Sequence, residues 1–151
     1  MAREARIVVI DTYTIIADLT GQATPQAVRL LDKVRTGEIK GVIHYLIIYE
    51  IAYHWHKGRL PFKGEDEMLE FIETYFDVEP LDASIAVEAS RLKVLANAKL
   101  RSSSDPQLRG RRLSVSDATT LALALKLDAP IITGDADLSY AALLFGVEVI
   151  W

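Results

Sequence analysis

The stretch Arg6-Ile-Val-Val-Ile-Asp11 decides the fold class of this 151-residue chain. Its four consecutive β-branched residues predict a short strand that is buried on both faces, as the strands of parallel sheets are. The run ends at Asp11, which places a carboxylate at the carboxyl end of the strand. Because open parallel sheets bind ligands outside the carboxyl ends of their strands, this edge is where we expect a functional site.

Working outward from this strand, short apolar strands alternate with helices along the chain. Further strands are predicted over 41–44, 78–81, 130–133 and 147–151, and helices over 25–36, 45–55, 65–76, 83–98, 118–127 and 138–145. Residues 101–112 are expected to form a polar loop. This alternation predicts an α/β fold with a central parallel sheet and helices on both faces, that is, a three-layer α/β/α sandwich formed by a single domain over 1–151.

The composition excludes several classes of protein. Half of the residues are apolar, which is enough for a sizeable core, and the chain has no cysteine. Disulfides, thiolate metal sites and cysteine nucleophiles are therefore excluded. We see no secretory signal and no uncharged apolar run of membrane-spanning length, so we expect a soluble, cytoplasmic protein without a membrane partner.

The charge of the chain is unevenly distributed. The segment from Arg91 to Arg112 holds seven basic residues and one acid, a net charge of +6, whereas the whole chain carries −4 and the remainder therefore −10. One interpretation is a solvated helix end followed by a loop. The other is a surface that contacts the phosphate backbone of a nucleic acid, chiefly through Arg109, Arg111 and Arg112.

Four aspartates are expected near the carboxyl edge of the sheet. Asp11 follows the first strand, Asp135 and Asp137 follow strand 130–133, and Asp117 lies in the first turn of a helix. Carboxylates that converge on one pocket repel one another unless a cation neutralises them, and Mg²⁺ and Mn²⁺ prefer such oxygen ligands. A bound metal would activate water and stabilise the charge that develops when a phosphoryl group is displaced.

Glu50 is the only acidic residue within the apolar helix 45–55. That helix is apolar nearly all round, so we expect it to be buried on most sides, in the core or at a subunit interface. An unpartnered carboxylate there would cost at least a few kcal/mol, which a metal ion would offset. The alternative is that Glu50 pairs with Arg29 or with His54, one turn further along.

Each aspartate also has a purely structural interpretation when taken alone. Asp11 would serve as a turn or N-cap residue, and Asp117 as the acidic partner of Ser114 in a capping box. The segment 133–137 would be an Asp-rich turn. The case for a metal site therefore rests on all the acids falling at compatible places together.

Four segments resemble the motifs of the PIN-domain family, in the expected order and over nearly the whole chain. They are Ile-Val-Val-Ile-Asp11-Thr-Tyr, Leu46-Ile-Ile-Tyr-Glu50-Ile-Ala, Leu113-Ser-Val-Ser-Asp117-Ala, and Pro130-Ile-Ile-Thr-Gly-Asp135-Ala-Asp137-Leu. The resemblance implies a PIN-like fold and an endoribonuclease that depends on Mg²⁺ or Mn²⁺. It also implies functional positions for the following residues: Asp11, Glu50, Asp117 and Asp135 as catalytic metal-binding carboxylates, Asp137 as a fifth ligand, and Thr133 as a hydrogen-bonding neighbour in the substrate-binding region.

Within this family, single-domain chains of this size look most like the VapC-type toxins of toxin–antitoxin pairs. The resemblance therefore implies an RNA substrate, a small antitoxin that binds in the acidic pocket, and a homodimer. Tyr49, Tyr53 and Trp55 would pack at the dimer interface or, alternatively, in the core. Tyr13 departs from the motif, where a small residue is common, and we expect it to narrow the pocket or to alter base stacking.

Three alternatives to a toxin ribonuclease remain at this stage. A haloacid-dehalogenase-type phosphatase also has Asp after its first strand, but it needs a second Asp two residues later, where this chain has Tyr13. A catalytically silent PIN-like binding module would typically have lost one of the acids. An RNA-processing PIN nuclease would share every feature described above.

Overall fold

The computed structural model describes residues 6–151, and within them a five-stranded sheet lies at the centre of the molecule. The strands are β1 (Ile7–Ile10), β2 (Lys40–Ile43), β3 (Asp77–Val78), β4 (Ile131–Ile132) and β5 (Val149–Ile150). Their order in the sheet is β3-β2-β1-β4-β5, and all neighbouring strands are parallel. The predicted parallel sheet is confirmed, with the first strand at its centre.

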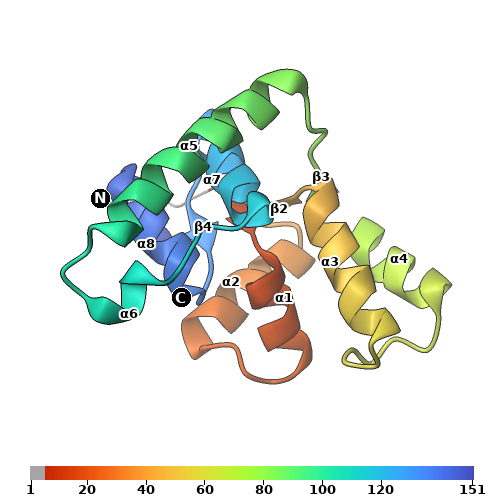
Figure 1. Ribbon diagram of the computed structural model, residues 1–151. Helices are drawn as coiled ribbons and strands as arrows, with labels where there is room; N and C mark the ends of the chain where they lie inside the picture. The colour runs from red at the N-terminus through yellow and green to blue at the C-terminus, as the bar shows by residue number, and fades with distance from the viewer. Residues whose placement is uncertain (1–5) are drawn as a thin grey trace.

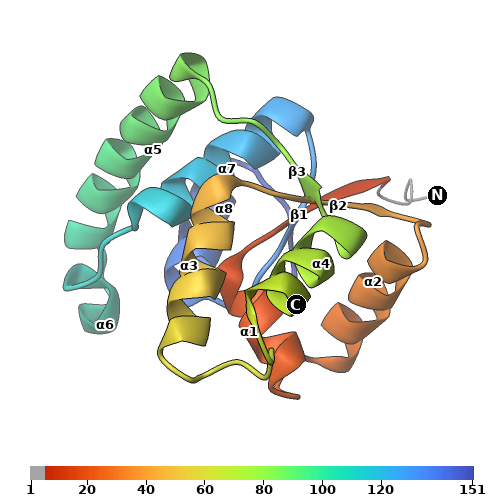
Figure 2. The same ribbon diagram turned by 90° about the vertical axis from the view of Figure 1, so that its right-hand side faces the viewer.

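Helices cover both faces of this sheet (Figures 1 and 2). They are α1 (Thr12–Leu19), α2 (Pro25–Arg35), α3 (Tyr45–His56), α4 (Glu65–Tyr75), α5 (Ala83–Arg101), α6 (Pro106–Arg109), α7 (Val115–Leu127) and α8 (Ala136–Leu144). Val8 and Ile10 pack with helices α1 to α4, whereas Val9, on the opposite face of the same strand, packs with α5, α7 and α8. Because successive strand residues point to opposite faces, a run of apolar residues builds both cores, and the predicted three-layer α/β/α sandwich is confirmed.

Three helices begin at side-chain caps of residue types that favour this position. The side chains of Thr24, Asp82 and Ser114 each accept a hydrogen bond from the backbone N–H group three residues further on. For α7 this donor is the N–H group of Asp117, at 3.0 Å from the Ser114 Oγ. The cap fixes the start of α7, so the carboxylate of Asp117 stands in its first turn.

Helix α1 was not among the predicted elements. Asp11 caps it, because its Oδ1 accepts the N–H group of Thr14 at 3.0 Å. The segment Thr-Tyr-Thr-Ile-Ile is rich in residues that favour strands, and its helical spacing is short, so sequence patterns give little indication of a helix here. The consequence is that Asp11 is both the end of β1 and the beginning of α1, which fixes its side chain firmly.

Several predicted boundaries were wrong. Helix α7 begins at Val115 rather than at Ala118, directly after its cap Ser114. The expected loop 101–112 contains the one-turn helix α6, and α5 continues to Arg101. Helix α8 begins at Ala136 rather than at Leu138, because Asp135 caps it by accepting the N–H group of Leu138 at 2.8 Å.

Helix α3 was expected to be buried on most sides, either in the core or at a subunit interface. The first of these two expectations, burial in the core of the chain, was wrong. Ile47 and Ile51 are buried, but 56%, 68% and 48% of Tyr45, Tyr49 and Tyr53 respectively are exposed. The alternative, that this tyrosine-bearing face lies at a subunit interface, stays a prediction. None of the helices in residues 6–151 is both long and apolar enough to cross a membrane.

Candidate active site

The strand order creates a switch point at the carboxyl ends of β1 and β4. The chain leaves β1 toward β2 on one side of the sheet, while β4 pairs with the other side of β1. The connections diverge at this point and leave a crevice at the edge of the sheet. A pocket of about 390 Å³ opens there.

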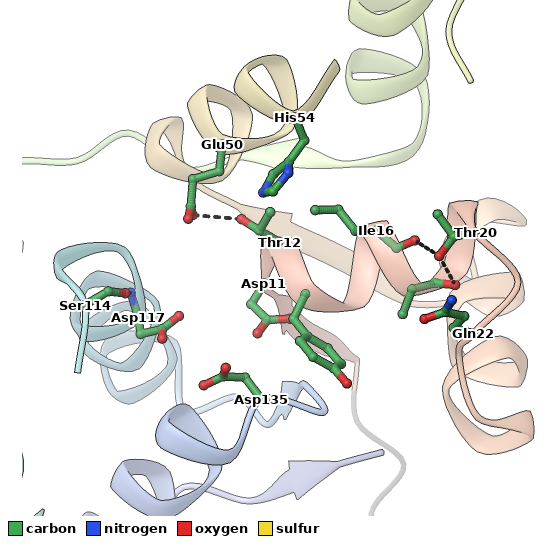
Figure 3. Close-up of a pocket in the computed structure, with 12 residues that line it drawn as sticks. Asp11, Thr12, Ile16, Thr20, Gln22, Glu50, His54, Ser114, Asp117 and Asp135 are labelled. Atoms are coloured by element: carbon green, nitrogen blue, oxygen red, sulfur yellow. Dashed lines mark hydrogen bonds between the residues drawn. The ribbon is translucent and has the colours of Figure 1, made fainter. Parts of the chain in front are cut away.

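The pocket brings together four of the five acids that the sequence analysis identified (Figure 3). Asp11, Glu50, Asp117 and Asp135 come from the end of β1, from α3, from α7 and from the cap of α8, and all four line the cavity. The remaining lining residues are Thr12, Tyr13, Ile16, Ala17, Thr20, Gln22, His54 and Ser114. Acids that are up to 124 positions apart in the sequence therefore line one pocket.

Asp11 is held by two hydrogen bonds and is only 2% exposed. Besides the N–H group of Thr14, its carboxylate accepts the hydroxyl of Thr133 at 2.5 Å from Oδ2. The same Thr133 oxygen accepts the backbone N–H group of Asp135 at 3.0 Å. Burial raises the pKa of Asp11 to about 6, although these hydrogen bonds oppose the rise.

Thr133 has no exposed surface. Its side chain therefore orients Asp11 and the loop that carries Asp135, as a hydrogen-bonding neighbour of the acids. The resemblance placed Thr133 in the substrate-binding region. Because its side chain is fully buried, it does not reach a substrate directly in this structure.

Glu50 is held by hydroxyl groups from two other helices. Its Oε1 accepts the Thr12 hydroxyl at 2.8 Å and the Ser116 hydroxyl at 2.6 Å. Among the described residues neither Arg29 nor His54, the alternative partners, bonds to this carboxylate; His54 lines the pocket and contacts Arg59 instead. Two neutral donors orient Glu50 without neutralising it, so its negative charge remains in the pocket.

A buried chain of hydrogen bonds stands behind Ser116. His44 is fully buried, and its Nδ1 accepts the N–H group of Leu46 at the start of α3. Its Nε2 therefore carries the hydrogen and donates it to the Thr120 hydroxyl at 2.8 Å, which in turn donates to the carbonyl of Ser116. Burial lowers the pKa of His44 to about 4 and keeps the ring neutral. Sequence patterns did not identify these positioning residues, because hydroxyls in helices usually bond locally.

The pKa of Asp117 is affected by all three of the other acids in the pocket. Burial, together with the negative charges of Asp135, Asp11 and Glu50, raises its pKa to about 7. Loss of solvent and repulsion both act against the ionised form, so a positive charge in this pocket would stabilise all four carboxylates.

The donor set fits a hard divalent cation. All four acids and the nearby hydroxyls offer oxygen ligands, which Mg²⁺ and Mn²⁺ prefer over nitrogen or sulfur. Within residues 6–151 no three of the acidic or histidine side chains are grouped as they would be around a metal ion.

The other predicted residues lie beside the pocket rather than in it. Asp137 does not line the cavity, and its Oδ1 accepts a hydrogen bond from Arg111 Nη1 at 3.0 Å. Arg112 donates to the backbone carbonyls of Arg109 and Arg111, and the three arginines are exposed. The Arg111–Asp137 ion pair holds the basic loop (residues 109–112) against α8, next to Asp135.

The fold matches several solved structures over nearly their whole length. One is a chain of VapBC2 from Rickettsia felis, in a structure bound to a promoter DNA fragment, with TM-score 0.66 and 12% identity. The match covers 95% of this chain and 97% of that chain. FitAcB from Neisseria gonorrhoeae gives TM-score 0.62 at 17% identity, with coverage of 95% and 96%. VapC20 from Mycobacterium tuberculosis, described as a sarcin-ricin loop cleaving toxin, gives 0.61 at 18%, with coverage of 89% and 94%.

A comparison with curated protein sequences finds no match. The sequence model of the PIN domain, however, matches residues 8–144. That span contains the sheet from β1 to β4 and all four acids of the pocket. The chain therefore belongs to the PIN-domain family.

Proposed function

We propose that this protein is a divalent-metal-dependent endoribonuclease that hydrolyses phosphodiester bonds of RNA in the acidic pocket. The observation that carries the proposal is the convergence of four carboxylates from four segments on one cavity at the switch point of a parallel sheet. The raised pKa of Asp117 supports it, because burial and then the neighbouring negative charges disfavour the ionised carboxylate, and a cation would relieve both effects.

When bound, Mg²⁺ or Mn²⁺ supplies charge neutralisation and lowers the pKa of a coordinated water. Asp11, Asp117 and Asp135 are the residues that would hold it. Both oxygens of Asp11 accept one hydrogen bond each and keep a lone pair for a cation. Glu50 offers Oε2, since Oε1 accepts two hydroxyls, and acts as a further ligand or orients the attacking water.

The basic loop beside the pocket supplies the contact with the RNA backbone. Arg109 and Arg112 are exposed, and Arg111 forms an ion pair with Asp137 at the surface. An exposed ion pair of this kind contributes at most about 1 kcal/mol, so a phosphate readily competes for the arginine. We expect the affinity for RNA to fall steeply as the salt concentration rises.

We further propose that the protein is the toxin of a toxin–antitoxin pair, inhibited by a small antitoxin, and that it acts as a homodimer. The support is the similarity in fold to VapBC2, FitAcB and VapC20 over almost the full length of each chain. The exposed tyrosines of α3 are the surface that we assign to the second copy.

Two of the alternatives remain distinguishable by experiment. An RNA-processing nuclease would show the same cleavage but would not be neutralised by a protein encoded beside it. A silent binding module would bind RNA without cutting it, although all four acids are present. The haloacid-dehalogenase alternative does not fit the family match, and position 13 holds tyrosine instead of the required acid.

The test is cleavage of a panel of labelled single-stranded RNAs in Mg²⁺, in Mn²⁺ and in EDTA. Asp11→Asn and Asp117→Asn are each expected to abolish cleavage, because each removes a charge that holds the cation. Asp66→Asn, an exposed acid on α4, is the matched control and keeps wild-type activity. Metal-independent cleavage that survives both pocket substitutions would contradict the site assignment, and a folded protein that binds but never cuts RNA would favour the binding module.

A further inference from the structure

The acidic pocket has an aromatic wall that the cleavage chemistry does not use. Tyr13, two residues after Asp11, lines the pocket and is 47% exposed. Its ring meets the ring of Trp151 edge to face, with 5.5 Å between the centroids and 71° between the planes. Edge-to-face pairs of this kind are favourable and hold both rings in place.

Gly134 makes room for this aromatic pair. A Cβ atom at this position would lie 2.5 Å from Trp151 Cε2 and 2.6 Å from Tyr13 Cε1. Both rings therefore lie directly against the backbone of the loop that leads to Asp135. An aromatic surface is thus fixed beside the acids by contacts from three segments of the chain.

The cavity continues from Tyr13 along one face of α1. Tyr13, Ile16, Ala17 and Thr20 follow helical spacing and all line it, and Gln22 lines its far end. In Figure 3 the acids lie at one end, Thr20 and Gln22 at the other, and Ile16 between them. At 1.5 Å per residue, the distance along the helix from Tyr13 to Thr20 is roughly 10 Å.

We propose that this part of the pocket is a nucleobase subsite, in which an unpaired RNA base adjacent to the cleaved phosphate stacks on Tyr13. The inference rests on the proposed ribonuclease function and adds the way in which the substrate is held. The amide of Gln22, which offers both a donor and an acceptor, lies at the end of the cavity where it reaches the polar edge of the base.

The chemistry of the lining favours a base over other ligands. Away from the acids the walls include the rings of Tyr13 and His54 and the aliphatic side chains of Ile16 and Ala17, which suit a flat group. Thr20 donates its hydroxyl to the carbonyls of its own helix, so it has no hydrogen left for an anion. Single-stranded nucleic acids are bound in this manner, by bases stacked on aromatic side chains beside a charged backbone site.

The experiment measures binding with and without bases. Fluorescence anisotropy is recorded for labelled oligouridylate, for oligoadenylate and for an abasic ribose-phosphate chain of the same length. An Asp117→Asn background with Mg²⁺ is used, and gels verify that the RNA stays intact. Tyr13→Ala is expected to weaken binding of the two base-bearing chains by about 5- to 150-fold, the usual effect of losing one stacked base, and to leave binding of the abasic chain unchanged.

Three further variants make the result specific. Tyr13→Phe keeps the ring and is expected to retain the affinity. Leu69→Ala removes a similarly exposed apolar side chain on α4, outside the pocket, and is expected to change nothing. Gln22→Ala is expected to change the ratio of the affinities for oligoadenylate and oligouridylate, because an amide reads the edge of a base.

The outcomes separate this inference from the ribonuclease proposal. Equal affinity for base-bearing and abasic chains, or a Tyr13→Ala variant that binds both as its parent does, overturns the subsite while metal-dependent cleavage still stands. A uniform loss for both kinds of chain in a folded Tyr13→Ala variant also overturns it. A parent protein that binds none of the three chains overturns the ribonuclease proposal and the subsite together.

Discussion

Replacing Asp117 by Asn should stabilise the metal-free protein, even though it destroys the proposed active site. The pKa of Asp117 is raised, because the folded state both removes water from the carboxylate and places it near three other acids. Asparagine has nearly the same shape and no charge. Its introduction removes the repulsion on the remaining acids as well.

The magnitude follows from the pKa. The carboxylate has a pKa of about 7 in the folded protein against 3.8 as its ordinary value, a difference of about three pH units. At 1.36 kcal/mol per unit this corresponds to an upper limit of about 4 kcal/mol. Because the folded pKa is the higher one, the contribution favours folding below pH 3.8 and is lost as the pH rises through 7. The variant should therefore be about 2–4 kcal/mol more stable than wild type at pH 8, and no more stable at pH 4.

The assay is thermal and urea unfolding of both proteins in EDTA over this range of pH. A gain of this size corresponds to roughly 4–16 °C in Tm for a domain of this length. Adding Mg²⁺ or Mn²⁺ should raise the stability of wild type toward that of the variant, by about 2.7 kcal/mol at a hundredfold excess over Kd. The variant should respond much less, since one carboxylate of the site is missing.

Asp66→Asn serves as the control, because it removes an exposed charge from α4 that has no pocket around it. It should not reproduce the dependence on pH. The reasoning is refuted if Asp117→Asn is equal to or less stable than wild type at pH 8 in EDTA. It is also refuted if the difference between the two proteins is the same at pH 4 and at pH 8.

Three further predictions concern the groups around the pocket. Ser116→Ala removes one of the two hydroxyls that orient Glu50 and should lower kcat/KM for RNA by about 10- to 100-fold with the fold intact, as measured by steady-state cleavage and circular dichroism. Gly134→Ala forces a methyl group against Trp151 and should destabilise the protein by about 1–3 kcal/mol in urea unfolding; an unchanged midpoint would contradict the close packing. The pKa of His44 is about 4, below its ordinary value of 6.5. Wild type should therefore lose up to about 3 kcal/mol of stability relative to His44→Asn as the pH falls from 6.5 to 4. A difference in stability between these two proteins that does not depend on pH would contradict a buried neutral ring.

Much of the fold was predictable, because the patterns that mark strands and helix ends reflect interactions between residues that are close in the sequence. An uninterrupted run of β-branched residues is typical of burial on both faces, and this predicted β1 as a buried strand of a parallel sheet. Its place at the centre of the sheet came only from the structure. Caps such as Thr24 and Ser114 bond to the backbone a few residues away, so they can be identified without any tertiary contact. Helix α1 escaped prediction because it depends on packing against the sheet rather than on its own propensities.

The sequence by itself also determined the chemical character of the site: acids at the ends of strands and within an apolar helix, with an expectation of hard divalent cations. Which side chains surround each acid was decided only by the tertiary structure. The hydroxyls that hold Glu50 belong to Thr12 and Ser116, which lie 38 and 66 positions away in the sequence. No local pattern specifies such partners, because they are set by the topology that brings α1 and α7 against α3.

Asp135 and Asp137 show the same division most clearly. Both follow β4, and only the resemblance to the PIN-domain motif ranks Asp135 ahead of Asp137, since nothing in the local sequence pattern separates them. In the structure Asp135 caps α8 and lines the pocket, whereas Asp137, roughly 200° further around the helix, is bonded to Arg111. The residue types determined that carboxylates would gather at this edge of the sheet. The direction in which the helix begins decided which of them enter the pocket, because a side chain can only reach where its backbone points it.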